Sequence, residues 1–112
     1  MSYEPLLENL LSFVTGLSVD ATGTRYDLET QLGANVRARR VKLRNRGSNI
    51  IYWNFTNLSG VVTSGATASP IVAVNEVVIM STRRPGIGAT VGVMSFKCDT
   101  GLTSTLDIEW WG

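Results

Sequence analysis

The sequence predicts an all-β fold: an antiparallel β-sandwich or jelly roll of about six to eight strands, with an N-terminal arm that contains a short helix. After residue 35, apolar and polar residues alternate with a period of two, and many of the apolar residues are β-branched or aromatic. Turn signals rich in Gly, Asn and Ser recur about every eight to twelve residues. No stretch in this region has the spacing of a helix of about ten residues, which disfavours an α/β sheet.

The chain has 112 residues, enough for one hydrophobic core, and its 44% hydrophobic content supports a packed interior. The change of pattern at residue 35 divides the chain into an arm over residues 1–35 and a β-sandwich domain over residues 36–112. The single cysteine, Cys98, excludes an internal disulfide framework and is expected in the core.

Apolar residues at three- and four-residue spacing predict the short helix of the arm, with Pro5 in its first turn and Gly16 as its stop. Two carboxylates and the lack of a long apolar run argue against a signal peptide or a membrane span, so no membrane partner is expected. Because the arm is too short for a core, its apolar stripe must rest on its own domain or on a neighbour. That stripe consists of Leu6, Leu10, Phe13 and Val14.

Six strands are expected after the arm. They cover residues 36–45, 50–58, 61–63, 76–81, 90–98 and 103–111. In the second strand, Ile51, Trp53 and Phe55 share one face. In the last strand, Trp110 points inward, so Trp111 turns outward, either as an anchor at an interface or as a residue packed under the arm.

The first of these strands is the most polarised part of the chain, since six of the ten basic residues lie between Val36 and Arg46. Its two halves alternate out of phase by one residue. A β-bulge at Arg39-Arg40 would reconcile the halves and place five charges on one outward face. Those five residues are Arg37, Arg39, Arg40, Lys42 and Arg44.

Three roles are open for this basic row: an electrostatic seam with an acidic protein surface, a solvated face that protects an edge strand, or a strip of phosphate contacts. We favour the protein seam. Nucleic acid is not expected, because no stacking aromatic residues are interleaved with the charges and the net charge is only +1. Arg83 and Arg84 would extend the positive surface, and residues 1–35, with five carboxylates against one arginine, are the expected counterpart.

The sequence contains no catalytic constellation, and we expect neither enzymatic activity nor a cofactor. It has no histidine, the usual base for a serine or cysteine nucleophile and a common zinc ligand. Asp99-Thr100-Gly101 matches the tripeptide of retroviral-type aspartic proteases, but Lys97 and Cys98 precede it where that family has an apolar strand. We therefore expect a hairpin turn. Asp107 and Glu109 are expected on the polar face of the last strand.

The order of features over residues 36–112 resembles that of the small β-sandwich or jelly-roll proteins that decorate tailed-phage virions. The similarity rests on the basic strand with its Asn45-Arg46-Gly47-Ser48 turn, the Ile/Tyr/Trp strand, the Ser-Gly-Ala-Thr loop before Pro70-Ile71, and the segments over residues 76–80 and 99–108. The resemblance implies a non-enzymatic virion component, commonly trimeric, that is assembled in the host cytoplasm and reaches its neighbours with an N-terminal arm.

We therefore expect a structural virion protein that decorates or cements a phage capsid through contacts with capsid or other virion proteins, and that forms homo-oligomers. One alternative is a polyanion- or glycan-binding β module with Tyr52, Trp53 or Trp111 as stacking platforms. Another is a tail or fibre component of the same kind of virion. The expected interface residues are Leu6, Leu10, Phe13, Val14, Arg37, Arg39, Arg40, Lys42, Arg44, Arg83, Arg84 and Trp111.

Overall fold

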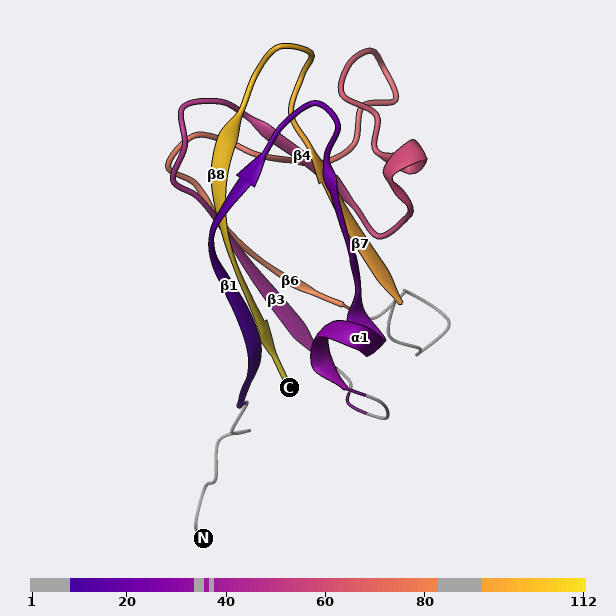
Figure 1. The fold of residues 1–112 in the computed structure, drawn as a ribbon, viewed down its shortest axis with the longest axis vertical. Helices are drawn as coiled ribbons and strands as arrows, with labels where there is room; N and C mark the ends of the chain where they lie inside the picture. Colours follow the sequence, from indigo (N-terminus) through magenta and orange to yellow (C-terminus); the bar gives the residue numbers. More distant parts are fainter. Residues whose placement is uncertain (1–8, 34–35, 37, 83–91) are drawn as a thin grey trace, which may run out of the picture.

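A computed structural model of the chain describes residues 9–33, 36, 38–82 and 92–112, which fold into two antiparallel four-stranded sheets (Figure 1). Sheet A contains, in spatial order, β1 (Leu10–Val19), β8 (Ser104–Trp111), β3 (Arg40–Asn45) and β6 (Val77–Ser81). Sheet B contains β2 (Thr24–Asp27), β7 (Val93–Lys97), β4 (Ile51–Asn54) and β5 (Ile71–Val72). The predicted all-β class is confirmed.

The pairing of the strands gives the sandwich jelly-roll topology. β1 pairs with β8, β2 with β7, β3 with β6, and β4 with β5, all antiparallel. This nested order is that of one long hairpin wound into two sheets, which defines a jelly roll. Of the two architectures that the sequence left open, the structure therefore has the second.

The core lies between the sheets and consists of the inward residues of alternating strands. Trp110 and Leu43 of sheet A meet Phe96 and Ile51 of sheet B, and all four side chains are fully buried. Tyr26 of β2 packs edge-on against two of them, with ring centroids 5.5 Å from Trp110 and 6.3 Å from Phe96. The predicted inward orientation of Trp110 is confirmed.

The predicted N-terminal helix is wrong for residues 10–16, which lie in β1. The register of β1 against β8 shifts twice, between Leu10 and Ser12 and between Val14 and Leu17. Each extra residue at such an irregularity resets the alternation of the strand, so inward residues recur at helix-like spacing. Leu11, Val14 and Leu17 all pack against the core in this way.

Residues 10–32 are therefore part of the sandwich rather than an arm, since β1 is an edge strand of sheet A and β2 an edge strand of sheet B. A short helix does occur in this region, but it is α1 (Leu28–Leu32). The Asp27 side chain caps α1 by accepting hydrogen bonds from the backbone N–H groups of Glu29 and Thr30, at 3.0 and 3.2 Å. Among the described residues, no helix is long and apolar enough to span a membrane.

Two other expectations about the connections need correction. Residues 61–63 form no strand: they follow the 3₁₀ turn η1 (Leu58–Gly60), and Val62 exchanges hydrogen bonds with Ser69 instead of joining a sheet. The predicted turn at residues 99–101 is present, with Gly101 at φ +80°. It is not a hairpin, because it joins β7 of sheet B to β8 of sheet A.

The fully buried Asn45 at the end of β3 ties the two sheets together. Its amide nitrogen donates to the carbonyl oxygens of Asn49 and Val72, at 2.8 and 2.9 Å. Its side-chain oxygen accepts from the Gly47 backbone N–H at 3.0 Å and the Ser104 hydroxyl at 2.7 Å. Every hydrogen-bonding position of the amide is used, so Asn45 fixes the β3–β4 connection against β5 and β8.

Candidate functional site

The outer face of sheet A gathers side chains from all four of its strands. Because Val41 and Leu43 of β3 and Ile108 and Trp110 of β8 point into the core, the residues between them point outward. We call this surface the charged face. It consists of Leu10, Phe13, Asp107, Glu109, Trp111, Arg40, Lys42, Arg44, Val77 and Ile79.

The charged face is organised by strand. β1 contributes apolar residues, β8 two carboxylates and Trp111, β3 cations, and β6 apolar residues again. One row crosses all four strands, because Phe13 lies opposite Glu109, Glu109 opposite Lys42, and Lys42 opposite Ile79. The two ends of this row are the most exposed apolar side chains of the described residues, since Phe13 and Ile79 each have 61% exposure.

The predicted phase slip in the basic strand is confirmed. Ala38 and Val41 are both buried, whereas Arg39 and Arg40 between them are both exposed. The backbone N–H of Arg39 donates to the Trp111 carbonyl at 2.7 Å, and Arg40 is also the partner of Trp111 in the strand register. Two residues opposite one is the arrangement of a β-bulge, and it keeps the cations on the outer face.

The carboxylates of β8 both have partners on the face. Asp107 accepts from Arg46 in a two-pronged ion pair, with N···O distances of 2.5 and 2.9 Å, and from the Gly16 N–H at 2.8 Å. The hydrogen bond from Arg46 is the main reason that the pKa of Asp107 lies below its usual value. Glu109 accepts from the Trp111 indole nitrogen at 3.0 Å.

These contacts correct the expected counterpart of the basic row. The carboxylates beside it are those of β8, because Arg44 lies opposite Asp107 and Lys42 opposite Glu109. The described carboxylates of the supposed arm lie elsewhere: Asp27 caps α1, Glu29 lies in its first turn, and Asp20 accepts from two backbone N–H groups in the turn before β2.

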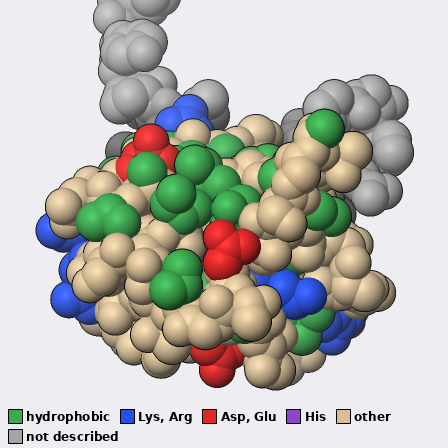
Figure 2. Space-filling view, turned by 90° about the horizontal axis from the view of Figure 1, so that it is seen from above, with side chains coloured by type: hydrophobic (Ala, Val, Ile, Leu, Met, Phe, Trp, Pro, Cys, Tyr) green, Lys and Arg blue, Asp and Glu red, His purple; other side chains and the backbone are tan. Residues whose placement is uncertain are grey.

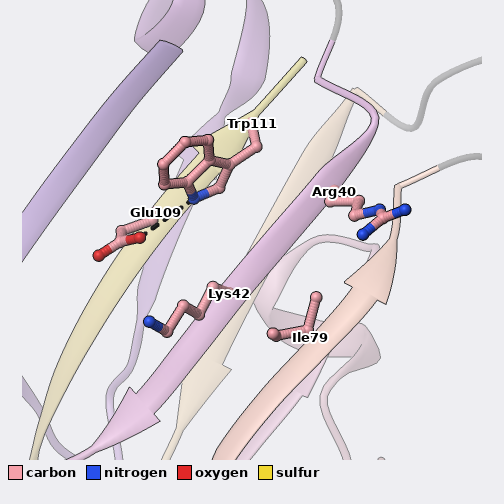
Figure 3. Close-up of a pocket in the computed structure, with 5 residues that line it drawn as sticks. All are labelled: Arg40, Lys42, Ile79, Glu109 and Trp111. Carbon is pink, nitrogen blue, oxygen red and sulfur yellow. Dashed lines mark hydrogen bonds between the residues drawn. The ribbon is translucent and has the colours of Figure 1, made fainter. Parts of the chain in front are cut away.

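A shallow open depression of about 230 Å³ lies on the charged face. Figure 3 shows Lys42 extending toward β8, the Arg40 guanidinium turned toward the end of β6, and Trp111 above Glu109. Ile79 forms the apolar side of the depression. Such a surface can bind an aliphatic or aromatic group with a charged group beside it, and it brings no nucleophile and base together.

Most of the predicted interface residues that the structure describes converge on the charged face. They are Leu10, Phe13, Arg40, Lys42, Arg44 and Trp111, with Arg39 exposed at its border. Val14 is the exception, because it packs against the core opposite Ile108. Leu6, Arg37, Arg83 and Arg84 lie outside the described residues.

Sequence reasoning missed Val77 and Ile79 as surface residues. The signal was present, because the β6 sequence Val-Val-Ile-Met is apolar in both phases and an edge strand of a sandwich has one face toward solvent.

The three predicted stacking platforms do not lie on one surface. Trp53 packs inward on Phe55 with ring centroids at 5.3 Å, and the Tyr52 hydroxyl donates to Asp99 at 3.3 Å, at sheet B.

A second exposed surface lies at the end of the sandwich where four connections cross between the sheets. Ile50, Val74 and Leu102 are 40%, 40% and 41% exposed there, on three different connections, and we call them the apolar end. Asn49 donates to the Thr103 carbonyl at 2.7 Å, which holds two of these connections together. Figure 2 shows several hydrophobic side chains on this end, with an acidic side chain among them and basic ones toward the rim.

The other chemically reactive side chains of the described residues are either buried in the core or not clustered. Cys98 is buried, its thiol donates to the Val19 carbonyl at 3.3 Å, and burial raises its pKa. No group of three or more Cys, Asp or Glu side chains that could hold a metal ion occurs in residues 9–33, 36, 38–82 and 92–112.

Comparison with protein-family models, curated proteins and solved structures finds no match to this chain.

Proposed function

We propose that this chain is a structural virion protein that decorates or cements a phage capsid by protein–protein contacts. The observation that carries the proposal is the presence of two separate exposed surfaces on one small domain, the charged face and the apolar end. A subunit that joins neighbours needs at least two such surfaces, whereas a simple ligand-binding module needs one.

The composition of the charged face favours a protein partner. Phe13 and Ile79 are each 61% exposed, so complete coverage by a partner contributes about 1–2 kcal/mol apiece, that share of the gain from full burial. The cations of β3 lie beside the carboxylates of β8, and alternating charges of this kind select a complementary protein surface rather than a polyanion. The jelly-roll topology agrees with the resemblance to decoration proteins, an argument by analogy of fold.

The proposal is tested by isolating virus particles from the cells that make this chain and separating them from free protein on a density gradient. The chain should migrate with the particles. Val74→Asp together with Leu102→Asp should lower its occupancy, because charges at the apolar end oppose burial. Ile71→Asp is the matched control, since Ile71 is 42% exposed on β5 of sheet B.

The proposal is wrong if the chain stays with the free proteins at the top of the gradient. Association of the chain with tails or fibres, rather than with heads, would support the alternative location in the same kind of virion. An equal loss of occupancy in the Ile71→Asp control would show that the apolar end is not the attachment surface.

A further inference from the structure

We infer that the charged face binds a second copy of this chain, about a two-fold axis that runs parallel to the strands of sheet A. The inference concerns the partner of one surface and does not depend on the virion assignment. It follows from the order of side-chain types across the four strands, which is apolar on β1, acidic on β8, basic on β3 and apolar on β6.

This order is self-complementary. A two-fold axis in the plane of the interface and parallel to the strands reverses the order of strands in the second copy. The cations of β3 then face the carboxylates of β8 in the partner subunit, and the apolar residues of β1 face those of β6. The other in-plane axis, perpendicular to the strands, would stack β3 on β3 and β8 on β8, with like charges opposed.

The register of sheet A determines which residues of the two copies face each other along the strands. Residues of one row lie at the same height, and an axis parallel to the strands preserves that height. Phe13 therefore faces Ile79 of the partner subunit, and Lys42 faces Glu109 of the partner subunit. One row further along, Arg44 faces Asp107 of the partner subunit. Each of these contacts occurs twice in the dimer.

The apolar contacts lie at the borders of the face and the charges at its centre. Phe13 and Ile79, each 61% exposed in the single chain, would lose most of that exposure. Packing of two sheets face to face with nearly aligned strands is a common arrangement in β proteins. In the depression shown in Figure 3, Ile79 lies on one side and Trp111 and Glu109 lie on the other. The space between them can hold an apolar side chain of the partner subunit.

The dimension of the face sets the expected affinity. Four strands about 4.8 Å apart and about five residues of 3.3 Å rise give a footprint of roughly 15–20 Å in each direction. That footprint, roughly 225–400 Å² per subunit, is smaller than the about 800 Å² per partner of a standard specific interface and corresponds to a weak contact. We therefore expect a reversible dimer whose mass depends on concentration, and whose charge pairs weaken as salt is added.

A dimer of this kind uses one patch on both subunits and closes at two copies. It therefore differs from the trimer that the resemblance implied. It also leaves the apolar end uncovered, since that surface lies at the end of the sandwich rather than on sheet A. One subunit can then meet a second copy with its charged face and another protein with its apolar end.

Sedimentation equilibrium of the full chain at increasing concentration tests the inference. The mass should rise from the 12.2 kDa monomer toward twice that value. Lys42→Glu should weaken the dimer by at least about tenfold, because the introduced carboxylate would face Glu109 of the partner subunit. Glu109→Lys should do the same. Lys97→Glu, the same charge change on β7 of sheet B, is the control and should leave the mass unchanged.

An equimolar mixture of the two charge-reversed chains should restore dimerisation, because the introduced glutamate of one chain then faces the introduced lysine of the other. Urea midpoints of the variants verify that each is folded. The inference is overturned by a chain that stays at 12.2 kDa up to about 1 mM, or by a three-copy mass. It is equally overturned if Lys42→Glu acts no more strongly than Lys97→Glu, or if the mixture fails to dimerise.

Discussion

Replacement of Asn45 by alanine should destabilise the fold more than any surface substitution in the chain. The side chain is fully buried and makes four hydrogen bonds, which join β3 to the following turn, to β5 and to β8. Alanine removes the side-chain donor of the Val72 carbonyl and the acceptor of the Ser104 hydroxyl, both in buried hydrogen bonds. Each such loss costs about 1–3 kcal/mol.

The other two hydrogen bonds of Asn45 are only partly buried, so water can replace part of them, and they add less. The summed loss is about 3–5 kcal/mol, a large fraction of the roughly 5–15 kcal/mol that stabilises a domain of this size. Urea denaturation followed by tryptophan fluorescence measures the free energy of unfolding.

Asn49→Ala is the matched control, because its amide makes an exposed hydrogen bond to Thr103 and should contribute about 1 kcal/mol or less. The reasoning is refuted if Asn45→Ala costs no more than Asn49→Ala. In that case the buried amide would not be what holds the two sheets in register.

Two further predictions concern the same end and the same face. Gly47→Ala should destabilise the fold by about 1–3 kcal/mol in urea, because a Cβ atom would overlap Ser104 and the Thr105 backbone, whereas Gly92→Ala has open space and should be neutral. The lowered pKa of Asp107 means that its contribution to stability is present above the unfolded value near 4 and is lost as pH falls through the folded pKa. Asp107→Asn should therefore lower the urea midpoint at pH 7 and flatten its decline toward pH 3, and an unchanged acid profile would contradict this.

The strands whose two faces have opposite environments were predictable from the sequence. β8 was expected over residues 103–111 and lies at Ser104–Trp111, because its inward residues and its polar outward residues alternate without interruption. In β3, the phase slip at Arg39-Arg40 predicted a bulge, and the backbone hydrogen bond to Trp111 confirms it. Alternation within one segment therefore determines which side chains share a face.

What could not be predicted depends on contacts between distant segments. The two irregularities of β1 make its inward residues recur as in a helix, and only pairing with β8 shows that the segment is extended. β5 has just two residues, too few for a periodic signal. The rows of the charged face arise from the register of four strands that are far apart in the chain, so the neighbours Phe13, Glu109, Lys42 and Ile79 cannot be read from any local pattern.

The pairing of Phe13 with Ile79 between two copies is the most direct test of the role of the charged face. In one chain these residues are separated by two intervening strands, roughly 14 Å, too far for a disulfide. Chains carrying Phe13→Cys and chains carrying Ile79→Cys are oxidised separately and as an equimolar mixture, and the covalent dimers are measured on a non-reducing gel. The native Cys98 is buried in all of them.

We predict covalent dimers in the mixture and little in either chain alone, because the axis parallel to the strands brings position 13 of one copy over position 79 of the other. Cross-linking of the Ile79→Cys chain with itself, at a level that mixing does not raise, would contradict the account. So would the absence of covalent dimers in all three samples at concentrations where the mass of the unmodified chain has doubled.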